Sequence, residues 1–180
     1  MHERRYTATI ERLRLPQRVE LLEIDRVVDL VLADLDVKSV LDVGTGSGIF
    51  AEAFAKKGIA VTGIDPNPDM LEAAKTFVPT GKFLKGTVEV IPVQNKAFDL
   101  VFLGHVLHES DDILKALSES KRCATYRVAI LEWPYKKEES GPPLEHRLKT
   151  EDILAAATTT GFSQMETIQL QHMTLFRLTT

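Results

Sequence analysis

The chain has 180 residues, of which 44% are hydrophobic and 27% are charged, and its net charge is −4 at pH 7. These values are typical of a globular protein and argue against a disordered chain or a fibrous repeat. The length favours a single domain, and the acidic balance gives no support to a partner such as nucleic acid or an anionic membrane.

The cysteine count and the hydropathy pattern bear on location. A single cysteine, Cys123, excludes a disulfide framework or a thiolate zinc site within one chain. It lies in a predicted helix, where we interpret it as a buried small hydrophobe and keep a reactive thiol as the alternative. No run approaches the ~18 apolar residues of a membrane span, and residues 1–15 lack the apolar core of a signal peptide. The sequence therefore predicts a cytoplasmic protein.

The first 36 residues are predicted to form an N-terminal helical cap on a core of residues 37–180, within one domain. Residues 7–35 have the apolar spacing of helices, and Pro16 is expected to separate a short helix from a longer one. The apolar positions of the longer helix are Leu21, Ile24, Val27, Val28 and Val31.

From residue 39 onward, short apolar runs alternate with amphipathic runs, as in a parallel sheet with crossover helices. The last two predicted strands are so close in sequence that we expect an antiparallel hairpin. The chain therefore predicts an α/β fold with a doubly wound, mostly parallel sheet of seven strands, with one antiparallel strand at or near the end. The predicted strands are 39–43, 61–64, 83–86, 99–104, 127–132, 164–170 and 173–179, and the almost fully apolar fourth is expected to be central.

Local signals mark the ends of the intervening helices. Gly58 is predicted to end the first of them and Asn67 to cap the second, while Thr150 and Gly161 are predicted to cap and end the last. Residues 110–112 are expected to open the helix that follows the fourth strand.

The most informative segment joins the first strand to its helix. Residues 40–48 read VLDVGTGSG, and the three glycines of this turn allow a ligand to lie against bare backbone beside unpaired helical amides. The next strand ends at Asp65, where a carboxylate can accept hydrogen bonds from both ribose hydroxyls of a nucleoside. We therefore expect a nucleoside cofactor at this edge, with a purely structural turn as the alternative.

The glycine spacing distinguishes between cofactors. A dinucleotide site has the pattern G-x-G-x-x-G, but Ile49 occupies the third glycine position and Gly48 gives G-x-G-x-G instead. The Gly-Lys-Ser/Thr of a P-loop is absent. Asp42 before the turn disfavours a nearby pyrophosphate and suits an ammonium group, such as that of a methionine moiety.

Three segments together resemble a known family: VLDVGTGSG, GIDPNPDML and GTVEVIPVQNKAFDLVFLGHVLHE. They are similar to successive motifs of the class I S-adenosylmethionine-dependent methyltransferases, especially the group of ubiquinone and menaquinone biosynthesis enzymes. The similarity covers roughly residues 18–162. It implies a Rossmann-like fold, S-adenosyl-L-methionine as cofactor and S-adenosyl-L-homocysteine as product.

The resemblance also implies roles for individual residues. The glycines would line the methionine and ribose portions of the cofactor, with Asp42 near the amino group and Asp65 on the ribose. Met70 would lie near the adenosine or else in the core, and Thr87 would flank the adenine although many relatives have an acidic residue there. The full set of implied cofactor-binding residues is Asp42, Gly44, Thr45, Gly46, Ser47, Gly48, Asp65, Pro66, Met70, Thr87, Val88, Gly104 and His105.

Candidate catalytic residues follow the fourth strand. Methyl transfer by in-line displacement needs mainly proximity and alignment, and a general base only if the nucleophile must lose a proton. His105 and His108 are the candidate bases, and ordinary packing or capping is the alternative for both. No metal site is expected, because the two histidines have no convincing third ligand.

Candidate substrate contacts come from the two ends of the chain. Trp133, His146 and Arg147 lie in the long loop after the fifth strand, and Tyr6 lies in the N-terminal segment, which covers the pocket in related enzymes. A structural loop around Arg147, a core or lid role for Trp133 and a solvated N-terminal helix are the alternatives. A small-molecule methyl acceptor is favoured over nucleic acid, and the chain is expected to be a monomer or a homodimer. A non-catalytic cofactor-binding subunit and a nicotinamide-dependent oxidoreductase remain competing functions.

Overall fold

The computed structural model describes residues 9–138 and 140–180. Within these residues, seven strands form one sheet in the order β3-β2-β1-β4-β5-β7-β6. Strand β7 pairs antiparallel with both β5 and β6, and the other pairs are parallel, so the predicted doubly wound sheet with one antiparallel strand is confirmed. The strands are β1 (Ser39–Val43), β2 (Ala60–Asp65), β3 (Lys82–Lys85), β4 (Phe98–Gly104), β5 (Ala124–Glu132), β6 (Gln164–Gln169) and β7 (Thr174–Thr179).

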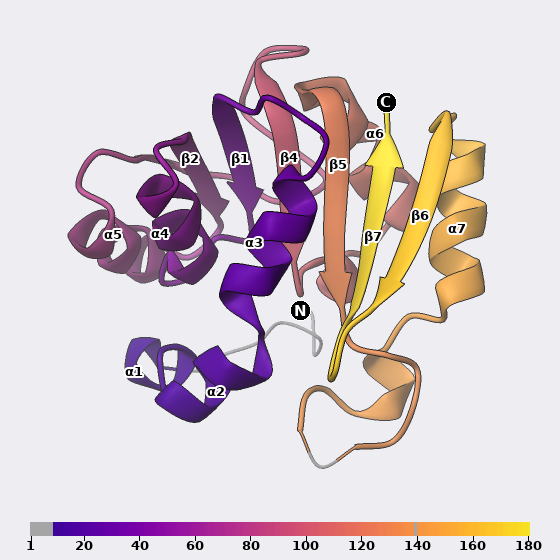
Figure 1. Cartoon of the computed structure of the whole chain (residues 1–180), viewed down its shortest axis with the longest axis horizontal. Helices are drawn as coiled ribbons and strands as arrows, with labels where there is room; N and C mark the ends of the chain where they lie inside the picture. Colours follow the sequence, from indigo (N-terminus) through magenta and orange to yellow (C-terminus); the bar gives the residue numbers. More distant parts are fainter. Residues whose placement is uncertain (1–8, 139) are drawn as a thin grey trace.

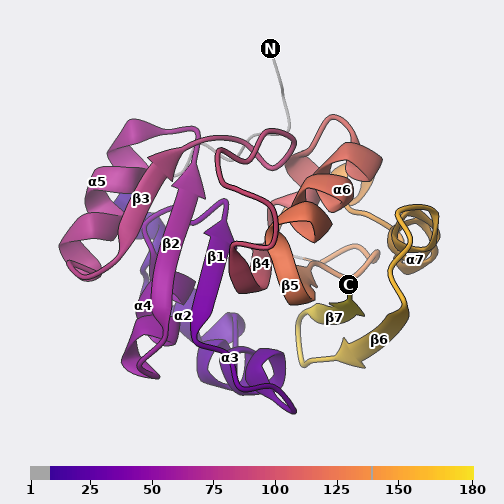
Figure 2. The same ribbon diagram turned by 90° about the horizontal axis from the view of Figure 1, so that it is seen from above.

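Helices cover both faces of the sheet, with α3 on one side and α6 and α7 on the other (Figure 2). The predicted central position of β4 is confirmed, and its side chains alternate between the two resulting cores. Among the described residues, none of the helices has the length and apolar character to cross a membrane. The helices are α1 (Ile10–Leu13), α2 (Pro16–Leu21), α3 (Ile24–Leu32), α4 (Ile49–Lys56), α5 (Pro68–Phe77), α6 (Ile113–Cys123), α7 (Thr150–Thr159) and the 3₁₀ turns η1 (Leu107–Glu109) and η2 (Leu144–His146).

The helix boundaries follow local chemistry, with one correction. The Asn67 side chain accepts a hydrogen bond from the Asp69 amide and caps α5, as predicted. Thr150 does not cap α7. The cap is Lys149, whose carbonyl accepts hydrogen bonds from the Asp152 and Ile153 amides, so Thr150 is already helical.

The N-terminal segment breaks once more than predicted. Pro16 begins α2 as expected, but a second break occurs at Glu23, whose backbone is left-handed (φ 46°). The Glu23 carboxylate accepts a hydrogen bond from the Gln171 amide at 2.8 Å and pairs with Arg26 at 2.7 Å. This contact with the β6–β7 turn depends on the tertiary structure, which is why helical spacing alone did not show the break.

The carboxyl ends of β1, β2, β4 and β5 meet at one edge of the sheet, which is the lower edge in Figure 1. Helices α1 and α2 lie on one side of this edge, and the long loop after β5 lies on the other. The fold therefore brings the glycine turn, Asp65 and the segments after β4 and β5 to the same place.

Candidate functional site

The glycine turn after β1 is packed tightly on two sides and open on a third. Gly44, Gly46 and Gly48 all have positive φ. A Cβ at Gly44 would lie 2.7 Å from Val106, and one at Gly48 would lie 3.0 Å from Ala74. At Gly46, the described part of the chain places only a methyl carbon of Leu13 within 4 Å, at 3.7 Å. A ligand can therefore approach the backbone at Gly46.

Asp65, the last residue of β2, faces this turn. Its carboxylate accepts hydrogen bonds from the amides of Gly46 and Asn67, both at 2.9 Å. Burial raises the pKa of this carboxyl group, and the two amides oppose the rise. Each carboxylate oxygen keeps a further lone pair, so the group can still accept hydrogen bonds from two hydroxyls.

Asp42 lies beneath the turn. Its side chain is 2% exposed and accepts a hydrogen bond from the Thr45 hydroxyl at 2.7 Å. Burial raises the pKa of Asp42 to about 7, despite the bond from Thr45. This carboxyl group is therefore expected to change between its neutral and ionised forms near neutral pH.

The residues present fit the cofactor that the resemblance implies. Ser47 in the turn is buried, and its hydroxyl has no hydrogen-bond partner among the described residues. A buried unpaired hydroxyl is costly, and a polar ligand group can satisfy it. This hydroxyl, the open backbone at Gly46 and the free lone pairs of Asp65 match a nucleoside with a polar amino-acid tail.

The predicted adenosine contacts lie next to Asp65. The Gly86 amide donates to the Asp65 carbonyl at 3.3 Å, which brings the segment that contains Thr87 and Val88 against the end of β2. Thr87 pairs with Val90 in a short bridge, and Val88 is 5% exposed. Pro66 is exposed and Met70 is half-buried.

His105 follows Gly104 at the end of β4 in an unusual backbone conformation, with φ +58°. Its Nε2 lies 3.3 Å from the sulfur of Met173, and its ring centre lies 5.3 Å from that of Trp133. A thioether can only accept a hydrogen bond, so we assign the imidazole proton to Nε2. Burial lowers the pKa of His105 to about 3, which makes it a weak base.

His108 forms a buried pair with Glu132, a residue that the sequence analysis did not single out. The Nδ1 atom of His108 lies 2.8 Å from one Glu132 oxygen, and the His108 amide donates to the other at 3.0 Å. Burial lowers the pKa of His108, but attraction to Glu132 outweighs it and the net shift is upward. The pKa of Glu132 is lowered in spite of burial, because attraction to His108 and hydrogen bonds from it favour the ionised carboxylate. The signal for Glu132 was a carboxylate at the end of an apolar strand, at the ligand edge.

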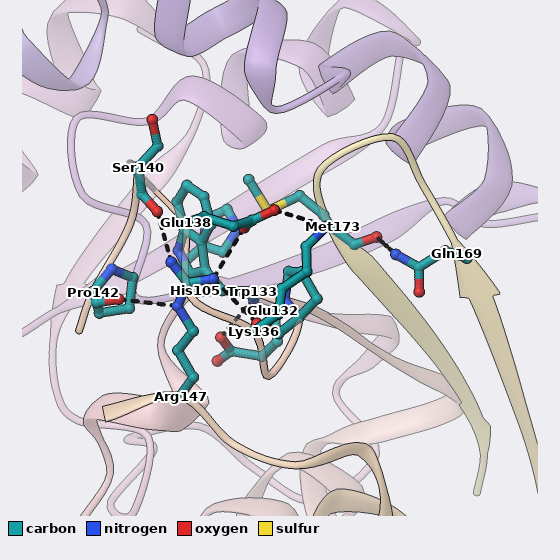
Figure 3. A network of polar contacts seen from close by, with 11 residues as sticks. His105, Glu132, Trp133, Lys136, Glu138, Ser140, Pro142, Arg147, Gln169 and Met173 are labelled. Carbon is teal, nitrogen blue, oxygen red and sulfur yellow. Dashed lines mark hydrogen bonds and ion pairs between the residues drawn. The ribbon is translucent and has the colours of Figure 1, made fainter. Parts of the chain in front are cut away.

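The loop after β5 changes the interpretation of Arg147. Its guanidinium group donates to the carbonyls of Pro142, Pro134 and Ser140 and pairs with Glu138, and the side chain is 1% exposed (Figure 3). These contacts favour the alternative of a structural loop over the predicted anion-binding role, because the donors are used within the loop.

The other predicted substrate contacts differ in their placement. Trp133 is buried against His105, and His146 is half-buried in η2. Tyr6 lies outside the described residues. Within those residues, no three His, Cys, Asp or Glu side chains group closely enough to hold a metal ion.

The sequence of this chain is similar to those of known methyltransferases. A model described as a methyltransferase domain matches residues 41–126. The demethylmenaquinone methyltransferase of Thermotoga maritima is 30% identical over 131 residues, which cover 69% of this chain and 57% of that protein. The corresponding enzyme of Chlorobaculum tepidum is 36% identical over 84 residues, covering 46% of this chain and 35% of that protein. The chain thus spans about half or less of the length of these curated relatives.

A solved structure agrees over nearly the whole chain. An S-adenosylmethionine-dependent methyltransferase from Aquifex aeolicus superposes with a TM-score of 0.83 at 24% identity, covering 94% of this chain and 96% of that one. The fold and the glycine turn with its terminal carboxylate define a Rossmann-like nucleoside-binding protein. The comparisons support a class I S-adenosylmethionine-dependent methyltransferase similar to the menaquinone-biosynthesis group, with S-adenosyl-L-methionine as the cofactor.

Proposed function

We propose that this protein transfers the methyl group of S-adenosyl-L-methionine to a small-molecule acceptor by in-line displacement and releases S-adenosyl-L-homocysteine. The observation that carries the proposal is the pairing of Asp65 with the Gly46 amide at the open side of the glycine turn. The similarity to demethylmenaquinone methyltransferases, which act on a small molecule by name, supports the choice of acceptor class.

The chain's own residues would bind the cofactor, orient it towards the acceptor and exclude water from the site. Bound cofactor supplies an electrophilic methyl group on a sulfonium centre. Asp65 would hold the ribose hydroxyls, and the turn with Ser47 would hold the amino-acid tail. Asp42 would support the turn from below and, when ionised, favour a nearby ammonium group. His105 and Trp133 would shield the acceptor side from water.

The two candidate bases differ in what they can do. His105 stays uncharged at neutral pH and, with its low pKa, takes up a proton poorly. Attraction to Glu132 raises the pKa of His108, so this histidine becomes a base only above the raised value. The site therefore suits a nucleophile that has already lost its proton or that passes it to water.

The first test is thermal unfolding with each candidate ligand. S-Adenosylmethionine or S-adenosylhomocysteine at ~100 times its dissociation constant should add about 2.7 kcal/mol of stability. We expect Asp65→Ala to abolish this gain, because the ribose contacts are lost. Glu72→Gln is the matched control, since Glu72 is exposed on α5 and pairs only with Lys75 among the described residues.

Each outcome has a clear meaning. Stabilisation by both adenosyl ligands that disappears in Asp65→Ala supports the proposal. Stabilisation by NAD alone would favour the oxidoreductase, and no stabilisation by any of the three ligands would contradict cofactor binding.

A second candidate function is a cofactor-binding subunit without catalysis. It is favoured by the engagement of both histidines, His105 with Met173 and His108 with Glu132. Labelled cofactor with a panel of small phenols, amines and thiols separates the two functions. Transfer of label to any of them supports the enzyme, and binding without turnover across the panel supports the subunit.

We also propose a single domain in which residues 1–36 form the helical cap, a cytoplasmic location, and a monomer or homodimer. The contacts of α1 with the glycine turn support the cap. Light scattering of the purified chain measures the oligomeric state directly.

A further inference from the structure

The loop after Trp133 is organised around one buried guanidinium group. Arg147 donates from Nε to Pro142 at 2.9 Å, from Nη1 to Pro134 at 3.1 Å and from Nη2 to Ser140 at 2.6 Å. Nη1 also lies 3.0 Å from the Glu138 carboxylate. These contacts join the beginning of the loop to its end, so the path of the loop depends on Arg147.

This folded loop lies directly on the indole of Trp133. Gly141 has φ +91°, and a Cβ there would come within 2.7 Å of two indole carbons. The guanidinium carbon of Arg147 lies 5.3 Å from the indole ring centre. Trp133 is consequently 5% exposed although it follows the last residue of a strand at the ligand edge.

Trp133 in turn contacts His105, which Met173 holds from another element (Figure 3). Arg147 is thus connected through Trp133 to the left-handed residue at the end of β4. Three other ionisable groups act on His105. Attraction to Glu132 favours its protonation, whereas Arg18 and His108 oppose it.

We propose that Arg147 is a positioning residue that folds the loop over Trp133, keeps water away from Trp133 and from the side of the half-buried His105 that Trp133 covers, and so maintains His105 as an uncharged surface on the acceptor side. The link to the acceptor rests on the proposed function. The exclusion of water from His105 does not, and it can be measured without cofactor or acceptor.

Trp133 provides the measurement, because it is the chain's single tryptophan. A protonated imidazole quenches a neighbouring indole more strongly than a neutral one. We take the difference in fluorescence between each protein and its His105→Asn counterpart, which removes contributions from other histidines. Asparagine tolerates the left-handed backbone at this position.

In the wild type, this difference should not change between about pH 5 and 8, because His105 stays neutral. In Arg147→Met, the loop opens and water reaches the pair. The difference should then titrate with a midpoint near the ordinary histidine value of about 6.5, and acrylamide should quench Trp133 severalfold more strongly.

Two further variants make the result specific. Gly141→Ala should have the same effect, because its Cβ would push the loop off the indole. His146→Gln is the matched control, since this half-buried neighbour of Arg147 should leave the profile unchanged. If Arg147→Met fails to fold, Gly141→Ala decides the question in its place.

The outcomes separate the two proposals. A profile without titration and unchanged quenching in the folded variants would overturn the positioning role. If adenosyl ligands fail to stabilise the wild type, the proposed function fails while the fluorescence result still decides the role of Arg147.

Discussion

The carboxyl groups of Asp42 in β1 and Asp65 in β2 both lie next to the glycine turn, but they differ in their hydrogen-bond partners. Asp65 is held by two backbone amides and faces the open side of the glycine turn. Asp42 lies beneath the turn, almost fully buried, and accepts a hydrogen bond from the Thr45 hydroxyl. The buried position favours the neutral form, which is why the pKa of Asp42 rises to about 7.

Asp42→Asn tests this pKa through the stability of the fold. A carboxyl group with a raised pKa makes the folded state bind more protons than the unfolded state, so stability falls as pH rises from about 3.8 to about 7. The full shift corresponds to at most roughly 4 kcal/mol. We expect the variant, relative to wild type, to become more stable between pH 5 and pH 8 in urea denaturation. A difference that does not vary with pH would contradict the raised pKa.

The contribution of the Glu132–His108 pair to the stability of the fold is lost both at high pH and at low pH, for different reasons. The His108 contribution is present below its ordinary pKa of 6.5 and is lost as pH rises through the raised value. The Glu132 contribution is present above 4.5 and is lost as pH falls through the lowered value. The pair therefore stabilises the fold most between these two limits.

Glu132→Gln should destabilise the protein by about 3–5 kcal/mol near pH 6, because it leaves a buried imidazolium without its partner. The loss should shrink as the pH rises through the raised pKa of His108, because the imidazole then becomes neutral in the wild type as well. Urea denaturation at about pH 6 and at a series of higher pH values measures it. The double variant with His108→Gln should recover part of the loss, and a double variant no better than the single one would show that charge is not the cause.

At the scale of elements, the N-terminal helices are attached by polar contacts more than by burial. Helices α1 and α2, both within the described residues, contain no buried residue. Arg14 connects them to the site: it donates to the Ser47 carbonyl at 2.9 Å, pairs with Glu52 of α4 and lies 3.5 Å over the Phe77 ring. The attachment of this cap to the glycine turn therefore depends strongly on one side chain.

Arg14→Met should loosen α1 and α2 without unfolding the sheet. A charged hydrogen bond contributes about 1.5–3 kcal/mol, so amide hydrogen exchange in these helices should accelerate at least tenfold. Hydrogen exchange with mass spectrometry measures this, and exchange in β4 should not change. Arg12→Met is the control, since Arg12 is exposed on the same helix. Equal exchange in wild type and Arg14→Met would show that other contacts hold the cap.

At the scale of the whole molecule, one sheet joins two hydrophobic cores. Phe102 of β4 packs against Phe50 at 4.8 Å and Phe54 at 5.5 Å between ring centres, while its neighbours Val101 and Leu103 belong to the core on the other face. Because the same strand contributes to both cores, we expect the two faces to unfold together.

Phe102→Ala should cost about 3–5 kcal/mol and keep a single transition, because it leaves a cavity in a fully buried cluster. Far-ultraviolet circular dichroism and tryptophan fluorescence should report the same midpoint. Tyr126→Ala, 49% exposed, should change stability by no more than about 0.5 kcal/mol. Two separate midpoints would show that the faces unfold independently.

Much of this molecule could be predicted from local patterns. The apolar runs located all seven strands, and the glycine turn and Asp65 lie together as their spacing indicated. The break at Glu23, the partner of His108 and the contacts of Arg147 could not be predicted, because each depends on residues distant in sequence or on the path of a long loop.

The sequence by itself determined the class of fold, because strand and helix periods and the glycine turn are local and are written in consecutive residues. Its resemblance to known methyltransferase motifs indicated the family and the cofactor. The tertiary structure decided the state of each candidate side chain. Burial and partners from other elements shift the pKa values of His105, His108 and Asp42, and the contacts of Arg147 within its own loop favour the alternative of a structural loop over a ligand contact. Such properties arise only when distant segments exclude water from one another.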